Sequence, residues 1–310
     1  MTGTAPSWRG SRRPARISAL SPFFGFAQFD FAGTLPLADG RYLASRDGDG
    51  GESVLVLQTL AAPPRPSRRR RKPRDADAAA TPPEVPVARA TAIRAFDRFD
   101  GPEGAAAWLA TATADEASVD ATVAAGVALL NEALHAHAVA AADPYVATVG
   151  PERAVAVRLG YGSGKQTAEG TFTAAYEVDV RATVGSRRRR REEDLRPQER
   201  VAGVLRGRER LDACEVLLLR ARADLDAGRR REATLQLRIG IEALLVELPD
   251  ALDDADHRGD IKALEGRRAG VEAAAERALK DALVPESETA VREALEIAER
   301  VLRRRRILDN

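Results

Sequence analysis

Apolar and polar residues follow two different periods along this chain. In the first half they alternate, most regularly over residues 155–161 and 176–181, which is typical of β-strands. From residue 197 onward, apolar residues instead recur at every third or fourth position, which is typical of amphipathic helices. The pattern therefore predicts an α+β fold, with an N-terminal antiparallel sheet and two helices followed by a C-terminal all-α helical bundle.

The N-terminal sheet is expected to hold about six strands and to begin with a meander of three antiparallel ones. Residues 23–34, 35–46 and 54–57 supply these three strands. Asp39 and Gly40 are expected to form the hairpin turn between the first two, because both central positions of a type I′ turn need positive φ. The continuous apolar run at 54–57 indicates a strand that is covered on both faces.

Further strands and two helices complete this half of the chain. A strand is expected at 86–96, and helices are expected at 102–114 and 116–141. Two alternating strands follow, and residues 162–170 are expected to join them as a hairpin loop. Five of the eight Phe residues lie within 23–31. We expect them in the core, because aromatic residues favour strands and this half of the chain has few others.

The C-terminal half is expected to form a bundle of about five helices. Helices are predicted at 197–207, 259–283 and 287–306, with a helical hairpin at 211–248 between the first two. Gly228 is expected to end the first helix of this hairpin, because glycine readily takes the left-handed conformation.

The hairpin at 211–248 resembles single tetratricopeptide-type or nucleotidyltransferase-associated helical units. The resemblance rests on Ala221, Gly228 and Ala233, and the hairpin lacks the aromatic positions that those repeats use. It implies a groove that could accept a partner helix or peptide.

Composition predicts a series of segments along the chain. Residues 1–17 are expected to be a disordered basic tail, and residues 18–184 the α+β domain. A disordered Pro/Arg-rich insertion at 61–84 interrupts that domain, because prolines remove hydrogen-bond donors and like charges repel. A basic-acidic linker at 185–196 leads to the helical bundle domain at 197–310. A domain boundary at 61–84 is the alternative, but it would leave three strands to form a core alone.

Positive charge is concentrated in three runs, although the formal net charge is only +1. The candidate polyanion-binding residues are Arg68, Arg69, Arg70, Arg71, Lys72, Arg187, Arg188, Arg189, Arg190, Arg191, Arg303, Arg304, Arg305 and Arg306. Clusters of this kind bind phosphates without sequence preference, by releasing counterions. The alternative is that the runs are solvated linkers in an arginine-biased chain. No aromatic residue that could stack on a base is interleaved with them, which weakens the nucleic-acid interpretation.

Residues 160–165 resemble a phosphate-binding loop in their glycine content. Leu159 occupies the position of the first glycine, and Gln166 follows Lys165 where magnesium binding needs Ser or Thr. A strand is also expected after this segment, whereas a phosphate-binding loop continues into a helix. The predicted structure is therefore a hairpin loop.

The sequence gives little support for a metal-binding site or for a catalytic nucleophile. His135 and His137 are two positions apart on an expected helix, so they cannot share a metal ion from one face. Residues 47–52 lack the glycine and the bidentate glutamate that a calcium loop needs. His257 is expected in a solvated acidic turn, and Cys214 in the core as a small apolar residue. We predict no catalytic, cofactor-binding or metal-binding residue.

The cellular environment is predicted from cysteine content and hydropathy. The single cysteine excludes an intramolecular disulfide and fits a reducing compartment, so we expect a cytoplasmic protein. We expect no contact with a membrane, because no run approaches the ~18 apolar residues that a spanning helix needs.

Three hypotheses for function follow from these patterns. The first is a non-enzymatic interaction or adaptor protein whose helical domain binds a protein partner or self-associates. The second is a nonspecific nucleic-acid-binding protein that uses the arginine runs. The third, and the least favoured, is an enzyme with a pocket between the two domains.

Overall fold

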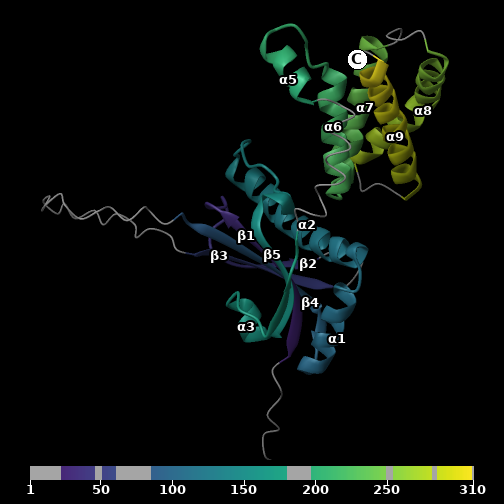
Figure 1. Ribbon diagram of the computed structural model, residues 1–310. Helices are drawn as coiled ribbons and strands as arrows, with labels where there is room; N and C mark the ends of the chain where they lie inside the picture. The colour runs from purple at the N-terminus through teal and green to yellow at the C-terminus, as the bar shows by residue number, and fades with distance from the viewer. Residues whose placement is uncertain are drawn as a thin grey trace, which may run out of the picture. The chain divides into compact units, whose positions relative to one another are not determined.

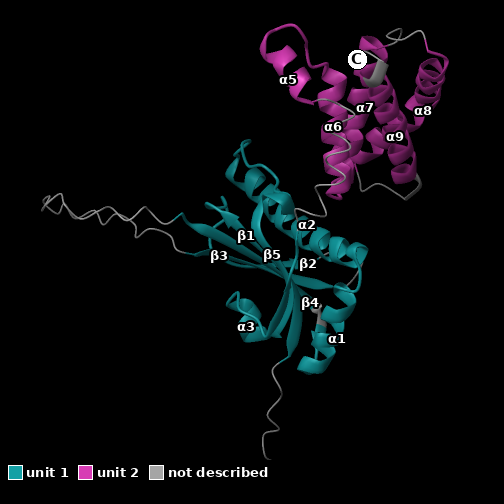
Figure 2. Cartoon of the chain, viewed as in Figure 1, with its two compact units in different colours: residues 1–179 teal, residues 180–310 magenta. Residues whose placement is uncertain are grey.

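The computed structural model describes residues 22–45, 51–60, 85–179, 197–248, 254–280 and 285–308 (Figure 1). Contacts divide the chain into two compact units, residues 1–179 and 180–310 (Figure 2). The first unit holds an antiparallel sheet and the second is helical, so the predicted α+β architecture is confirmed. The insertion at 61–84 and the arginine runs at 68–72 and 187–191 lie outside the described residues.

Unit 1 is built on a six-stranded sheet in the order β2-β3-β4-β1-β5-β6. Its strands are β1 (Phe23–Ala32), β2 (Gly40–Ser45), β3 (Glu52–Leu60), β4 (Val87–Phe99), β5 (Ala154–Ser163) and β6 (Ala174–Glu177). Its helices are α1 (Pro102–Ala112), α2 (Glu116–Ala141), the short 3-10 helix η1 (Pro151–Arg153) and α3 (Gly164–Ala168). β1 lies inside the sheet, paired antiparallel with β4 on one side and β5 on the other.

The predicted meander of the first three strands is wrong. β2 pairs with β3 as expected, but β3 and β4 separate β2 from β1. Gly40 opens β2 and is not among the described glycines with positive φ, so Asp39 and Gly40 do not form a type I′ turn. The Asp39 carboxylate instead accepts hydrogen bonds from the backbone N–H (2.9 Å) and the hydroxyl (2.8 Å) of Thr59.

The apolar character of β1 on both faces explains its inner position. Ala27 and Phe29 face α2, whereas Phe24 faces α3 and Phe26 packs against Phe172 after it. A strand at the edge of the sheet would leave one row of its backbone groups unpaired. Pairing β1 on both edges and covering both of its faces buries Phe26 and Phe29, so the predicted core position of the Phe-rich stretch is confirmed.

Helix α2 has the bounds that the sequence predicts, and it packs closely on the sheet. At Gly126 the helix backbone comes so near β1 that a Cβ would lie 2.8 Å from the Cβ of Ala27. The expectation that no segment is apolar enough to cross a membrane needs correction. By length and composition α2 could cross one, because it has 26 residues and a mean hydropathy of 1.3 over 18 of them. Seven residues of α2 are buried, and one third of the apolar window is buried within the structure.

The connection between β5 and β6 is partly helical. The two strands pair antiparallel, as predicted for a hairpin, but α3 occupies the expected loop. The Ser163 side chain accepts a hydrogen bond from the backbone N–H of Gln166, and the Gln166 side chain accepts one from the backbone N–H of Ser163. This reciprocal pair is a capping box, which starts the helix at Gly164.

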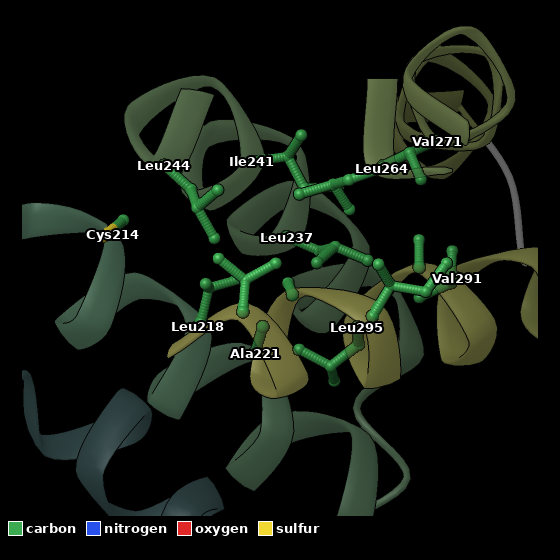
Figure 3. Close-up of a cluster of buried hydrophobic side chains, with 14 of the residues drawn as sticks. Cys214, Leu218, Ala221, Leu237, Ile241, Leu244, Leu264, Val271, Val291 and Leu295 are labelled. Atoms are coloured by element: carbon green, nitrogen blue, oxygen red, sulfur yellow. The ribbon is translucent and has the colours of Figure 1, made fainter. Parts of the chain in front are cut away.

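Unit 2 contains five helices among its described residues, in agreement with the predicted number. They are α5 (Pro197–Leu205), α6 (Ala213–Asp226), α7 (Arg230–Glu247), α8 (Ala255–Lys280) and α9 (Pro285–Leu308). Gly228 has a φ of +75° between α6 and α7, so the predicted helix end is confirmed. The core lies between α6, α7, α8 and α9, with Leu218, Leu237 and Leu264 fully buried in it (Figure 3). α5 contributes no buried residue to this core.

Candidate functional site

An apolar groove lies between α5 and α6 in unit 2. It is a cavity of about 320 Å³. One face of α5 lines the cavity with Val201, Val204 and Leu205. These residues are three and four positions apart, so they share that face of the helix. Leu211 and Leu219 belong to the opposite wall, before and along α6. We call this cavity the α5–α6 groove.

The apolar side chains of the α5–α6 groove are accessible to solvent. The exposed fractions are 56% for Val201, 82% for Leu205, 60% for Leu211 and 62% for Leu219. The other exposed large apolar residues in the described part of unit 2 are Ile239, Val246 and Leu279. More than half of these side chains therefore gather at one groove, whereas exposed apolar residues are usually scattered singly.

A buried carboxylate at the groove links α5 to the bundle. The Glu215 side chain on α6 is 5% exposed. It accepts hydrogen bonds from both terminal nitrogens of Arg200 at 2.8 and 2.5 Å, and from Arg306 on α9 at 3.2 Å. Burial raises the pKa of Glu215, but the hydrogen bond and charge of Arg200, together with those of Arg306, outweigh burial and hold the pKa below its ordinary value. This ion pair fixes the wall that α5 forms.

Three of the four arginines at 303–306 contact carboxylates within unit 2. The partners are Asp254, Asp256 and Asp260 for Arg304 (2.9 to 3.5 Å), Asp212 for Arg305 and Glu215 for Arg306. These guanidinium groups hold α9 to α6 and to the start of α8. Arg303 is exposed. The predicted polyanion-binding residues of this run are therefore already engaged in internal ion pairs, except Arg303.

The loop between α5 and α6 gives the groove a positive rim. Arg206, Arg208 and Arg210 are exposed, and none of them forms an ion pair with the described residues. The loop has two acidic residues, and both face other arginines: Glu209 lies 3.8 Å from the Arg200 guanidinium, and Asp212 pairs with Arg305. The rim consequently offers three arginines to an incoming negative charge.

A second polar cluster in unit 1 has a structural role. Asp30 accepts hydrogen bonds from Arg89 at 2.7 and 2.9 Å and from Arg158 at 2.8 Å. Gln28 and Arg89 also donate to the carbonyl oxygen of Gly170, which follows α3. Burial raises the pKa of Asp30, but the hydrogen bonds and charges of the two arginines hold the pKa below its ordinary value. The cluster fastens the end of α3 to the sheet.

The glycine-rich segment at 160–165 has no phosphate-binding geometry. Gly160 lies inside β5, and the Ser163 hydroxyl serves the capping box of α3. The helix has only five residues and leads into β6. A phosphate-binding loop instead needs a long helix whose N-terminus faces the phosphates.

The prediction for His257 is wrong, and the prediction for Cys214 is confirmed. His257 lies fully buried in the first turn of α8, and its two ring nitrogens have no hydrogen-bond partner. It precedes Ile261 by four positions and therefore continues the apolar stripe of a helix that begins earlier than expected. Cys214 is buried in the core of unit 2.

Metal-binding residues do not gather in the described part of the chain, where no group of three or more His, Cys, Asp or Glu side chains could hold an ion. His135 is exposed on α2. The segment at 47–50, which resembles a calcium loop, lies outside the described residues.

The α5–α6 groove is not predicted from the sequence. Leu211 stands three positions before Cys214 and seven before Leu218, a spacing typical of one helix face, yet it precedes the helix and is exposed. A usable signal is the run at 216–219, which is apolar at four successive positions. Successive residues point in different directions on a helix, so this run indicates a second apolar surface besides the core.

Comparisons with protein-family models, with curated proteins and with solved structures find no match for this chain. The functional proposals therefore rest on the geometry and chemistry of the described residues alone.

Proposed function

We propose that this protein is a non-enzymatic interaction protein whose helical unit binds an amphipathic segment of a protein partner in the α5–α6 groove. The observation that carries the proposal is the concentration of exposed apolar side chains around a cavity of about 320 Å³. Apolar grooves between helices accept the apolar face of a partner helix in several recurring recognition modes.

The rim specifies the chemistry of the partner segment. Arg206, Arg208 and Arg210 are exposed, and they lie in the loop that joins the two walls of the groove. A segment with apolar residues on one face and Asp or Glu residues beside that face matches both features. Complementary charge chiefly raises the association rate and selects the partner, whereas burial of the apolar side chains provides most of the affinity.

The test is a display selection on the full-length protein with two libraries of amphipathic helical peptides. The libraries share the same apolar positions, and one carries Asp and Glu where the other carries Lys and Arg. We expect enrichment from the acidic library alone. In the variant Leu219→Asp, the affinity of enriched peptides should fall by at least about tenfold, because a charge then occupies the apolar wall.

The variant Ile239→Asp is the matched control, because Ile239 is similarly exposed at 57% but lies on α7 away from the groove. It should bind the enriched peptides as the unaltered protein does. Equal binding by the Leu219→Asp variant, or equal enrichment from both libraries, would overturn the proposal. Light scattering measures whether the protein forms a dimer. If it does, and if Leu219→Asp converts the dimer to a monomer, the groove binds a second copy of this chain instead of a partner peptide.

Nonspecific nucleic-acid binding through the arginine runs is the second candidate, and the internal ion pairs of Arg304, Arg305 and Arg306 make it the weaker one. This candidate predicts that the protein binds labelled single- and double-stranded nucleic acid, as measured by fluorescence anisotropy. The affinity should fall steeply between about 50 and about 200 mM salt. Replacing the arginines at 68–71 and 187–191 by Ser should then weaken binding uniformly across sequences. Absence of binding at the lower salt concentration would reject this candidate.

A further inference from the structure

A second cavity, of about 360 Å³, lies in unit 1 between α2 and the sheet. The sheet side of the cavity comes from β2, β3, β4 and β1, and much of its lining is small: Ala27, Ala44, Gly51, Ala92, Ala125 and Gly126. Gly126 and Ala27 bring α2 close to β1, and the other small side chains of the lining leave space beside that contact. We call it the α2–sheet cavity.

An aromatic ring forms one wall of the α2–sheet cavity. Trp108 on α1 packs against the backbone of Gly25, where a Cβ would lie 2.8 Å from three atoms of the indole. The glycine therefore allows the ring to lie directly on β1. Trp108 remains partly exposed, so its indole is available to a ligand as well as to the sheet.

An irregularity in β4 places a positive charge at the cavity. Between the pairs Phe26–Ile93 and Phe24–Arg98, β1 contributes a single residue and β4 contributes four, beginning with Arg94. Bulges of this kind change the direction of side chains and are frequent beside functional sites. Arg94 lines the cavity, and its strand partner Ser53 on β3 lines it too.

Few polar side chains belong to the described lining of the cavity. Besides Arg94, side-chain polar groups come from the hydroxyls of Ser53 and Thr122 and from the indole of Trp108. The Thr122 hydroxyl donates its hydrogen to the carbonyl oxygen of Ser118, so it can only accept a further hydrogen bond. No carboxylate is among the described residues of the lining. The described lining therefore combines an apolar interior with one cationic side chain, Arg94, which also interacts within the protein.

We propose that the α2–sheet cavity binds a small amphiphilic monocarboxylate. The apolar body of the ligand would lie against Trp108 and the alanines, and its carboxylate would contact the guanidinium of Arg94. Guanidinium and carboxylate match in geometry, and the five N–H donors of an arginine can serve a ligand together with a protein partner. The cavity volume is at the lower end of the range for small-molecule sites, about 300–1,000 Å³. One arginine suits a monoanion better than a polyphosphate.

The test uses decanoate and the fluorescence of Trp108 in the full-length protein. Trp8 is the only other tryptophan, so the variant Trp8→Phe makes Trp108 the sole indole reporter. Titration with decanoate should give a saturable change in Trp108 emission. The variant Ala125→Leu should abolish this change by filling the cavity, whereas the control Ala124→Leu should preserve it. Both alanines are exposed on α2, and only Ala125 lines the cavity.

The charge requirement is tested with decanol, which has the same apolar chain and no carboxylate. Decanoate should bind about tenfold more tightly than decanol, and Arg94→Met should remove the difference, because a hydrogen bond to a charged group contributes roughly this much. Circular dichroism checks that each variant is folded. The proposal is wrong if no saturable change occurs up to about 1 mM decanoate. It is equally wrong if Ala125→Leu titrates like Ala124→Leu.

Discussion

At the scale of single residues, Cys214 shows how burial and a neighbouring carboxylate determine thiol chemistry. It is the second residue of α6, and a helix N-terminus ordinarily favours the thiolate. Here the Glu247 carboxylate accepts hydrogen bonds from the backbone N–H groups of Ala213 and Cys214 at 3.3 and 3.0 Å. Burial, with this carboxylate, raises the pKa of Cys214 to about 12. The thiol is therefore protonated and enclosed in the native state.

We predict that Cys214 resists alkylation in the folded protein. Iodoacetamide at about pH 8 should leave the mass unchanged in native buffer and add one label in concentrated urea, since the thiolate is the reactive form. Mass spectrometry counts the label directly, because the chain has a single cysteine. Stoichiometric labelling without urea would contradict the burial of this side chain.

Asp30 makes the stability of unit 1 depend on pH in the acidic range. Its pKa is lowered in the folded state, because hydrogen bonds and charges from Arg89 and Arg158 outweigh the effect of burial. A carboxyl group with a lowered folded pKa stabilises the protein above its unfolded pKa of about 3.9. That stabilisation is lost as the pH falls through the folded pKa.

We predict that Asp30→Asn lowers the free energy of unfolding by about 1–3 kcal/mol at about pH 7, because two partly buried guanidinium groups lose their charged partner. The difference from the unaltered protein should shrink as the pH falls below about 4, where protonated Asp30 resembles the amide. Urea unfolding at several pH values measures both effects. A constant difference at all pH values would mean that the carboxylate charge is unimportant.

At the scale of elements, the close contact between α2 and the sheet depends on Gly126. We predict that Gly126→Ala destabilises unit 1 by about 1–3 kcal/mol, since the new methyl group would lie 2.8 Å from Ala27 and 3.0 Å from Phe29. Gly266→Ala is the matched control, because Gly266 is also helical and a Cβ there meets nothing within 4 Å. That change should stabilise by about 0.5–1 kcal/mol. Thermal or urea unfolding distinguishes the two signs.

The bounds of single helices and strands could be predicted from the sequence more reliably than the pairing of the strands in the sheet. The bounds of α2 follow from its apolar period, and the glycine-marked end of α6 follows from local chemistry. The position of β1 beside β4 and β5 depends instead on which strands cover it. A local Asp-Gly signal cannot determine that choice. Phe residues at both odd and even positions of β1 do indicate a strand covered on both faces, and hence a place inside the sheet.

The two candidate sites could not be predicted from the sequence for a related reason. Val201 and Leu205 have the spacing of a core-facing helix, and only the docking of α5 through Arg200 and Glu215 leaves that face uncovered. Arg94 reaches the α2–sheet cavity because four residues of β4 stand opposite Gly25, a register that no local pattern specifies. Sites formed by packing gaps and irregular pairing depend on tertiary structure.

At the scale of the whole molecule, each unit builds its core from its own residues. The buried cluster of unit 2 consists of residues between 214 and 302, and the sheet and helices of unit 1 bury the Phe-rich stretch without them. The two proposed sites follow the same division, with the α2–sheet cavity in unit 1 and the α5–α6 groove in unit 2. The two proposals can therefore be tested separately by substitutions within each unit.

We predict that residues 197–310 fold without the rest of the chain. The fragment retains every residue of its buried cluster and the ion pairs between α5, α6 and α9, so it should give a helical circular dichroism spectrum and a cooperative thermal transition. Leu264→Asp in the same fragment should abolish the transition, because a charge would lie at a fully buried position. A non-cooperative melt of the unaltered fragment would show that the helical core needs residues from outside it.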